Sequence, residues 1–283
     1  MVDREWIIKK VLAVLSMLVV VGILLIVVFV TKAALPVITK VGLFNLFSSN
    51  WYPPTGHYGI MIFIVGTLLT TVGGLLIGAP LALGTALFLT EMAPRRAATI
   101  VTRGVEVLAG IPSIVLGWLG LIILLPWIKA LTRTGGTGIF AASIILGIMV
   151  MPTITTIAKD ALETVPADYR LGSIGLGATR WQTTWRVTLP AAKSGIIVAV
   201  ILGMGRAIGE TMAVALVIGP ATSYAKGLFS PTHTLTTKML MEMGESSGIQ
   251  RSALFFMALV LLLIAIALIA LIRVASRKKA YAR

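Results

Sequence analysis

The sequence predicts an all-α, polytopic membrane protein with six transmembrane helices. Hydrophobic residues make up 58% of the 283-residue chain and charged residues only 12%, whereas a soluble domain has roughly 25% charged residues. Apolar stretches long enough to cross a bilayer as a helix, which takes about 20 residues, recur along the whole chain. They are too long and too evenly spread to be the buried cores of soluble domains.

Six apolar stretches are therefore expected to be the spans. The second is long enough to tilt or to overhang the membrane, and the second, third and fourth contain prolines, which membrane helices tolerate where neighbouring groups satisfy the backbone. In chain order the predicted spans are residues 11–30, 58–89, 105–127, 138–158, 195–218 and 252–272. The first has a charged start like a secretory signal, but its apolar core is longer and no clear cleavage site follows, so we interpret it as a retained helix.

The distribution of Lys and Arg predicts that both termini lie in the cytoplasm, because cytoplasmic loops carry an excess of these residues. With this orientation most of the 24 basic residues lie in inner segments. The inner basic residues are then Arg4, Lys9, Lys10, Arg95, Arg96, Arg103, Lys159, Arg170, Arg180, Arg186, Lys193, Arg273, Arg277, Lys278, Lys279 and Arg283. The net charge of +14 is thus explained by membrane orientation rather than by nucleic-acid binding.

Several kinds of chemistry are excluded by what the sequence lacks. It has no cysteine, which excludes disulfides, thiol catalysis and Cys-based metal sites. Its only histidines, His57 and His233, are far apart, so we expect no metal site and interpret both as solvated residues of outer loops. No phosphate-binding loop of the type G-x-x-x-x-G-K-[ST] occurs, and no catalytic cluster is present. The chain is therefore not expected to be an enzyme or to hold a cofactor.

The inner segment 159–194 is too long for a simple turn and is predicted to carry a short helix, residues 178–187, on the membrane surface. Trp181 and Trp185 would share one face of this helix. Gly177 permits a tight bend before it, and Pro190 is expected to end it. By its residues alone, the helix is either a docking surface for a soluble partner or an interfacial helix in the headgroups.

This loop resembles the cytoplasmic loop of ABC importer permeases, which reads Glu-Ala-Ala, three residues, Gly, nine residues, Ile, one residue and Leu-Pro. The glycine, the spacing and the Leu-Pro pair match, but a leucine stands in place of the glutamate. The resemblance implies a coupling helix that fits a groove on an ATP-hydrolysing subunit. The residues that it assigns to coupling are Leu171, Gly172, Ser173, Gly177, Ala178, Thr179, Trp181, Leu189 and Pro190.

Arg206 and Glu210 are the only charges predicted deep in the membrane. Arg206 lies ten residues into the fifth predicted span, about 15 Å at 1.5 Å per residue, where a charge costs about 2.5–3.5 kcal/mol. The two residues are four apart and are expected to pair on one helix face. They either join helices as a structural ion pair or form part of an anion path, in which the planar guanidinium suits an oxyanion such as phosphate.

The stretch around these residues, 206–214, resembles the fifth-span signature of the C-type permease subunits of phosphate-specific (Pst) ABC transporters. The sister A-type subunit usually reads Gly-Glu-Thr-Ala-Pro there, whereas this chain continues Met212-Ala213-Val214. The stretches 64–70, 80–84, 91–96 and 108–115 agree with this resemblance, which covers about residues 58–272. It implies a type I ABC importer permease fold of the MetI-like kind in a prokaryotic cell membrane.

The resemblance also implies a division of the chain and a set of partners. Residues 1–57 would form the N-terminal tail, first span and outer loop, 58–272 the permease domain with its coupling loop at 159–194, and 273–283 a basic cytoplasmic tail. The partners would be an A-type permease subunit, two cytoplasmic ATP-binding subunits, an external phosphate-binding protein, inorganic phosphate and the lipid bilayer. ATP would be bound and hydrolysed by the partner subunit.

Two other functions remain open from the residues. The same machine could carry molybdate or sulfate, since one arginine does not distinguish between oxyanions. An ATP-independent secondary transporter or channel would need no surface helix on the inner loop and would often show an inverted repeat; none is visible. Glu106, near the predicted inner end of the third span, is interpreted as a boundary charge facing water rather than as a substrate ligand.

Overall fold

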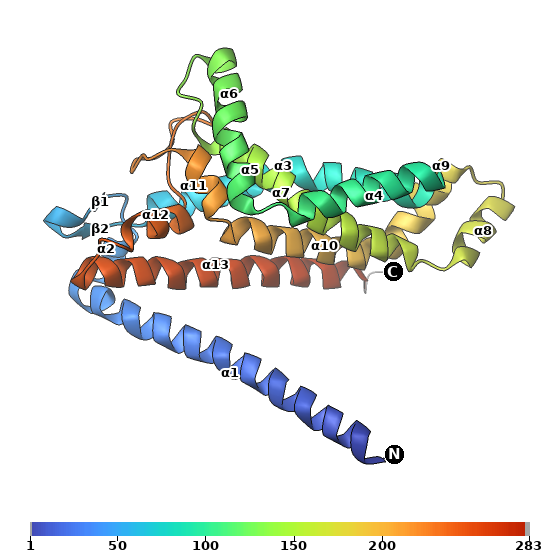
Figure 1. The fold of residues 1–283 in the computed structure, drawn as a ribbon, viewed down its shortest axis with the longest axis horizontal. Coiled ribbons are helices and arrows are strands. Elements are labelled where there is room, and N and C mark those ends of the chain that lie inside the picture. The colour runs from blue at the N-terminus through green and yellow to red at the C-terminus, as the bar shows by residue number, and fades with distance from the viewer. Residues whose placement is uncertain (1, 281–283) are drawn as a thin grey trace. The chain divides into compact units, whose positions relative to one another are not determined.

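The computed structural model describes residues 2–280 and consists mainly of helices, with one short hairpin (Figure 1). Two π-helical turns each join two α-helices, a third follows the end of an α-helix, and one 3-10 turn lies between the two strands. The elements are α1 (Val2–Val41), α2 (Leu43–Leu46), β1 (Trp51–Tyr52), η1 (Pro53–Thr55), β2 (His57–Tyr58), α3 (Met61–Leu87), η2 (Phe88–Met92), α4 (Arg95–Gly110), α5 (Ser113–Leu119), η3 (Gly120–Leu124), α6 (Leu125–Thr132), α7 (Ile139–Glu163), α8 (Ala167–Gly175), α9 (Arg180–Thr183), η4 (Thr184–Thr188), α10 (Leu189–Gly209), α11 (Met212–Ile218), α12 (Leu235–Glu242) and α13 (Gly248–Ala280).

Six helical segments within residues 2–280 are long and apolar enough to cross a membrane, which confirms the predicted number of spans. The first extends further than predicted, since the helix continues through Pro36 to Val41. The six segments are Ile8–Val41, Met61–Met92, Ser113–Thr132, Ile139–Glu163, Arg180–Gly209 and Gly248–Val274.

The chain divides into two compact units, and the first comprises the chain up to Met61 together with Met241–Leu263. The apolar window of α1 has no buried residues within the chain, as expected for a helix that faces lipid. Phe29 of α1 meets Phe255 of α13 edge to face, with ring centroids 5.6 Å apart. The antiparallel hairpin β1–β2 is held by Trp51, whose indole Nε1 donates to the Glu242 carboxylate at 3.2 Å.

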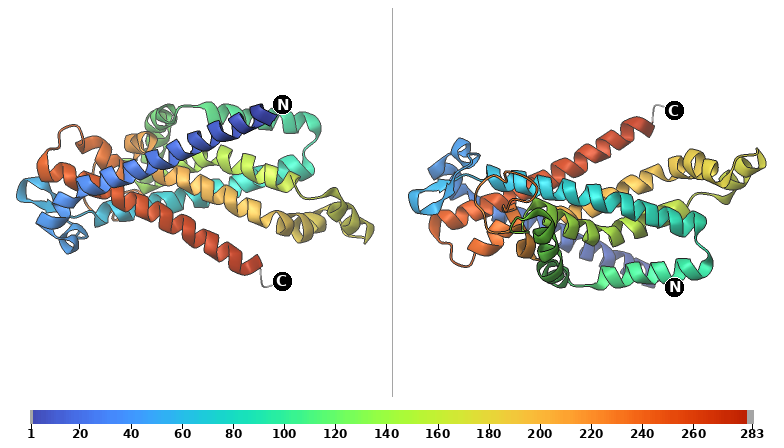
Figure 2. Two further views of the ribbon diagram at one scale, coloured as in Figure 1. Left: turned by 90° about the horizontal axis from the view of Figure 1, so that it is seen from below. Right: turned by 90° about the horizontal axis from the view of Figure 1, so that it is seen from above.

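The second unit, Ile62–Leu240 with Ile264 onward, is built around α7. Helices α3, α4, α10 and α11 run past or pack against α7, as Figure 2 shows from two sides. Leu146, Val150 and Ile154 of α7 are at most 1% exposed and form the centre of the apolar core. Gly203 of α10 lies so close to Ile154 that a Cβ there would clash, and this close packing fixes α10 on α7.

The third predicted span is not one straight helix. Ile111 and Pro112 have extended backbone angles and separate α4 from α5. Helix α4 runs back beside α3, whereas α6 turns across the direction of α3, α7 and α10 (Figures 1 and 2). The proline removes a backbone donor and restricts the residue before it, so the chain changes direction there. The apolar window Ser113–Thr132 lies entirely after this break.

Candidate functional site

Arg206 lies in the last turn of α10, on a face that the chain leaves exposed. Its Nη1 donates a hydrogen bond to the Thr153 hydroxyl of α7 at 3.2 Å. Thr153 lies about midway along α7, with 14 residues before it and 10 after it in the helix, so the Arg206 guanidinium is held beside the middle of α7 although Arg206 lies in the last turn of α10.

The predicted ion pair between Arg206 and Glu210 is absent from the described part of the chain. Helix α10 ends at Gly209, and Glu210 has extended backbone angles, φ −68° and ψ 130°. The helical spacing that would bring the two side chains together therefore stops before Glu210. Instead, Oε1 of Glu210 accepts a hydrogen bond from the Ala213 backbone N–H at 3.1 Å, which is how a carboxylate caps the first turn of a helix.

A buried threonine-rich segment, residues 232–238, holds the break between α10 and α11. The hydroxyl of Thr236 donates to the Glu210 carbonyl oxygen at 3.0 Å, an oxygen left without a helical partner by the break. The backbone N–H of Leu235 donates to the Thr67 hydroxyl of α3 at 2.9 Å. The segment thus connects the break to α3 by hydrogen bonds.

The position of His233 in this segment corrects a prediction. His233 is only 3% exposed, rather than solvated on an outer loop. The segment folds back on α3, where the His233 ring lies 6.2 Å from the Phe63 ring and its carbonyl oxygen occupies the space beside Gly66. His57, by contrast, is exposed as predicted and contacts the Thr55 hydroxyl.

The glycines beside Arg206 have different surroundings. Gly203 faces α7, as described above, but a Cβ added at Gly205 or Gly209 would meet no atom of the chain. Both glycines are exposed on α10, as Arg206 is. Of these three glycines, Gly203 alone allows close helix packing within the described residues.

Within the predicted coupling loop, α8 is a surface helix, and residues 180–188 are also helical but continue into α10 instead of forming a separate short helix. Helix α8 has no buried residue, and it exposes a set of large apolar side chains. Leu171, Gly172 and Ser173 lie on α8, and the Ser173 hydroxyl is 3.0 Å from that of Thr183. Beyond α8, Gly177 adopts a φ of +87°, which other residues rarely adopt, so the predicted tight bend is present. The exposed apolar residues are Tyr169, Leu171, Ile174 and Leu176.

The residues expected to form a separate helix instead begin the long helix that contains Arg206. Thr179 caps it: its hydroxyl accepts from the Gln182 N–H, and its own N–H donates to the Gln182 side chain, a reciprocal capping box. Ala178 lies in the turn before this cap. Trp181 and Trp185 share a face as predicted, with ring centroids 5.4 Å apart, and both are exposed.

Pro190 does not end this helix, contrary to expectation. Leu189 and Pro190 are the first residues of α10, which continues directly from α9 through the π-helical turn η4. In that turn the Leu189 N–H bonds to the carbonyl oxygen of Thr184, five residues back. A wider turn makes room for a proline ring, which would otherwise clash with the preceding turn of an α-helix.

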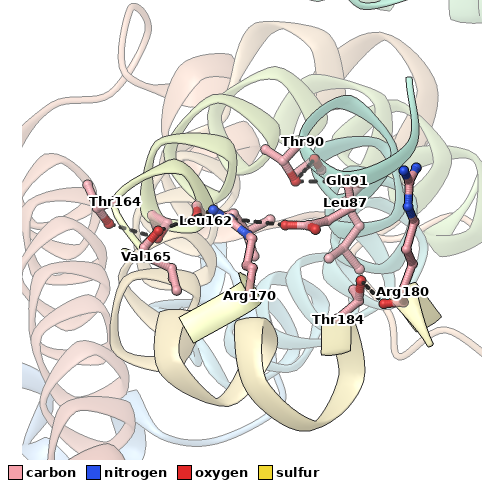
Figure 3. Close-up of polar contacts among 11 residues, drawn as sticks. Leu87, Thr90, Glu91, Leu162, Thr164, Val165, Arg170, Arg180 and Thr184 are labelled. Atoms are coloured by element: carbon pink, nitrogen blue, oxygen red, sulfur yellow. Dashed lines mark hydrogen bonds and ion pairs between the residues drawn. The ribbon is translucent and has the colours of Figure 1, made fainter. Parts of the chain in front are cut away.

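Arg170 fixes α8 to the ends of two other helices (Figure 3). Its Nη2 lies 3.0 Å from Oε1 of Glu91, in the π-helical turn η2 that ends α3. The same guanidinium donates to the carbonyl oxygens of Leu162 at 2.8 Å and Val165 at 3.2 Å, at the end of α7. The Glu91 side chain is only 13% exposed, so this pair is largely shielded from water.

Sequence reasoning missed the roles of Arg170, Thr236 and Thr153. Each contacts an element distant in sequence: 79 residues separate Arg170 from Glu91, 26 separate Thr236 from Glu210, and 53 separate Arg206 from Thr153. No local pattern identifies such partners. The capping box at Thr179 and Gln182 was, however, a visible signal for the true start of the helix.

No group of three or more His, Asp or Glu side chains within residues 2–280 is arranged to hold a metal ion. Among the described charges, Arg170 and Glu91 pair with each other, whereas Arg206 and Glu210 make separate contacts. The chemistry that these groups offer is binding of charge and positioning of helices.

The family described as binding-protein-dependent transport system inner membrane component matches residues 74–281. A probable ABC transporter permease protein, YqgH of Bacillus subtilis, is 41% identical over 83% of this chain and 78% of its own length. The phosphate transport system permease protein PstC of Pasteurella multocida is 39% identical over 77% of this chain and 75% of its own.

Solved transporters share the fold. A bacterial alginate ABC transporter, crystallised with an alginate pentasaccharide-bound periplasmic protein, matches 98% of this chain and 96% of its own with a TM-score of 0.68 at 15% identity. The MetNI methionine ABC transporter in an inward-facing conformation matches 82% of this chain and 99% of its own with a TM-score of 0.58 at 19% identity. The predicted MetI-like importer architecture is thereby confirmed.

Proposed function

Because the chain belongs to the family of binding-protein-dependent transport inner membrane components, we propose that it is one permease subunit of an ATP-driven phosphate importer in a prokaryotic cell membrane. The relatives named as phosphate permeases support the substrate. The single observation that carries the proposal is the position of Arg206, which is exposed beside the middle of α7 and has no carboxylate partner in the described chain.

Arg206 provides positive potential for a tetrahedral oxyanion that has lost part of its hydration shell. Its guanidinium keeps most of its donors available, because within the described residues it donates to one neutral hydroxyl, that of Thr153. A planar set of N–H donors suits phosphate oxygens. Glu210 acts on this site indirectly, since its carboxylate caps α11 and so fixes the break that follows Arg206.

The second permease subunit supplies the other side of the path. Arg206, Gly205 and Gly209 lie together on an exposed face of α10, and a Cβ added at either glycine would meet no atom of the described residues within 4 Å. A permease of the A type would complete the path there. An external phosphate-binding protein would deliver phosphate at the end of the bundle that carries the segment 232–238.

The opposite end of the bundle transmits the energy of ATP. We assign it to the cytoplasm, with both termini there, in agreement with the Lys and Arg distribution. Helix α8 would dock into a groove of a cytoplasmic ATP-binding subunit, because docking would remove its exposed apolar side chains from water. Two such subunits, one for each permease, bind and hydrolyse ATP, and Arg170 passes their movement to α3 and α7 through its contacts.

The transport cycle follows from these positions. Closure of the two ATP-binding subunits would move α8 and open the path outward, and hydrolysis would reset it. The coupling works because ATP binds the two states with different affinities. Arg206 should bind phosphate weakly, since a deep energy well would retain the ion.

Uptake by the whole complex tests this function. The complex of this chain, a second permease, two ATP-binding subunits and the binding protein is reconstituted in vesicles, and radiolabelled phosphate is supplied with ATP. We expect ATP-dependent accumulation that excess sulfate or molybdate does not reduce. Competition by sulfate or molybdate instead would favour an importer for another oxyanion. Accumulation without ATP would favour a secondary transporter.

A further inference from the structure

Helix α4 is amphipathic, and no packing within the described residues accounts for its exposed polar face. Arg96, Thr99, Arg103 and Glu106 follow one another at intervals of three and four residues, so they share one face, and all four are exposed. The opposite face packs inward, where Leu108 meets the apolar core. No residue of α4 is fully buried.

The direction of α4 aligns this polar face with two candidate membrane-spanning helices. In two views α4 runs antiparallel to α3, and it packs along α7 (Figures 1 and 2). Both α3 and α7 contain spanning segments. The 16 residues of α4 extend about 24 Å at 1.5 Å per residue, most of the roughly 30 Å of a bilayer's hydrocarbon core. An amphipathic helix resting on the membrane surface would instead lie across α3 and α7.

Arg103 and Arg206 lie at about the same depth. Arg170 bonds to both Glu91 and the Leu162 carbonyl, so the end of α3 is level with Leu162 of α7. From Leu162 back to Thr153, the partner of Arg206, is about 14 Å along α7. From Arg95, where α4 starts shortly after Glu91, to Arg103 is about 12 Å along α4.

Charges at that depth are unfavourable in lipid and normally face protein or a water-filled cavity. Neither Arg103 nor Glu106 forms an ion pair in the part of the chain that the structure describes. The helix that carries Arg206 packs on α7, as α4 does. A single hydrated path beside α7 would therefore solvate both arginines.

We propose that the polar face of α4 lines the anion path together with Arg206. This inference rests on the proposed function. Arg103 is a second cationic residue for a tetrahedral oxyanion, and the Thr99 hydroxyl is a neutral donor one turn away. Glu106, one turn beyond Arg103, lowers the positive potential so that the anion is released. Its earlier interpretation as a boundary charge is replaced, because Glu106 lies well inside α4.

Cysteine accessibility tests the position of this face, since the chain has no native cysteine. Single variants Thr99→Cys and Glu106→Cys are compared with Val101→Cys and Leu108→Cys, on the packed face, in the reconstituted complex. We expect the water-soluble anionic reagent sulfonatoethyl methanethiosulfonate to label the first two at least ten times faster, and phosphate to slow the labelling at Thr99→Cys. Labelling by a lipid-soluble maleimide alone would overturn the proposal.

Transport variants test the role of Arg103. We expect Arg103→Gln to lower phosphate uptake about ten-fold and Arg103→Lys to retain most of it, whereas Lys129→Gln on α6 leaves it unchanged. Normal uptake by Arg103→Gln would remove Arg103 from the path. If the wild-type complex took up no phosphate while the α4 face still reacted with the anionic reagent, the path would stand and the assignment of phosphate would fail.

Discussion

Arg170 and Arg206 both lie near helix ends in the same unit, yet their surroundings differ. Arg170 pairs with a shielded carboxylate, Glu91, and donates to two backbone carbonyls, so its donors are largely used within the chain. Among residues 2–280, Arg206 has one neutral hydrogen-bond partner, Thr153, and its side chain is exposed. A guanidinium satisfied inside the chain positions helices, whereas one left with a hydroxyl partner remains available to an anion.

The comparison also separates two kinds of helix end. At Arg170, the ends of α3 and α7 are tied to α8 by charged contacts, which suits an element that must transmit movement. At Arg206, the break between α10 and α11 is held by the Glu210 carboxylate and the Thr236 hydroxyl, and neither pairs with the arginine. The break therefore fixes the position of Arg206 without neutralising its charge.

Replacing Arg206 should have the largest effect on transport. Arg206→Gln removes the charge and keeps a donor, so a charge-assisted hydrogen bond worth about 1.5–3 kcal/mol is lost, or about 10- to 100-fold in uptake. Lys193→Gln, on the exposed side of the same helix, is the control and should leave uptake nearly unchanged. Initial rates of phosphate uptake measure both. Equal losses in the two variants would mean that net charge alone matters.

Breaking the Arg170 contact should destabilise the complex and weaken coupling. Arg170→Met leaves Glu91 without its cation, at a cost of about 1.5–3 kcal/mol, and raises the ATP hydrolysed per phosphate transported. Thermal unfolding and this ratio are measured together. The control is Lys159→Met, because Lys159 and Glu163 form an exposed pair at 3.7 Å, worth at most about 1 kcal/mol. A normal ratio in Arg170→Met would limit this arginine to a stabilising role.

The glycines of α10 distinguish packing inside the chain from packing outside it. Gly203→Ala should destabilise the subunit by about 1–3 kcal/mol, because the added Cβ meets Ile154. Gly205→Ala meets open space, and its effect on the isolated subunit should stay within about 0.5 kcal/mol. Denaturation in detergent measures both. If Gly205→Ala weakens only the assembled complex, a second permease packs against Gly205. If Gly205→Ala destabilises the isolated subunit as much as Gly203→Ala does, the open space assigned to Gly205 is contradicted.

The smallest predicted effect concerns the hydrogen bond that holds the break. Thr236→Val keeps the shape of the side chain and removes the donor to the Glu210 carbonyl, a loss of about 1 kcal/mol and about five-fold in uptake. Thr236→Ser should restore most of the rate. Thr39→Val is the control, since Thr39 bonds only within its own exposed helix turn. Failure of the serine to rescue would assign the loss to packing rather than to the bond.

Hydropathy and length were enough to predict the fold class and the number of spans, since each span's apolar run is local. They failed where charges and prolines had to be interpreted. Because α4 carries charged residues such as Arg103, hydropathy did not predict that a helix runs beside α3 there. Pro112 lies at a break between two helices rather than at a kink within one helix. Pro190 had the opposite outcome, because a π-helical turn accommodates it.

The site was predictable in its residue types and less so in its contacts. Depth alone identified Arg206, but its pairing with Glu210 assumed a helix that ends at Gly209. The burial of His233 depends on a loop folding back on α3, which no periodicity indicates. The sequence of the coupling loop indicated the bend at Gly177, but the helix after this glycine continues into α10 rather than standing alone.

Restoring the charge at position 206 tests most directly whether it acts on the anion. Arg206→Cys is prepared in the complex and treated with aminoethyl methanethiosulfonate, which adds a cation, or with methyl methanethiosulfonate, which adds none. The untreated wild-type chain, having no cysteine, reports any effect of the reagents on the other subunits. We predict that Arg206→Cys loses phosphate uptake and that the cationic reagent alone restores a substantial part of it. Equal uptake after both reagents would contradict a role for the charge of Arg206 in the anion path.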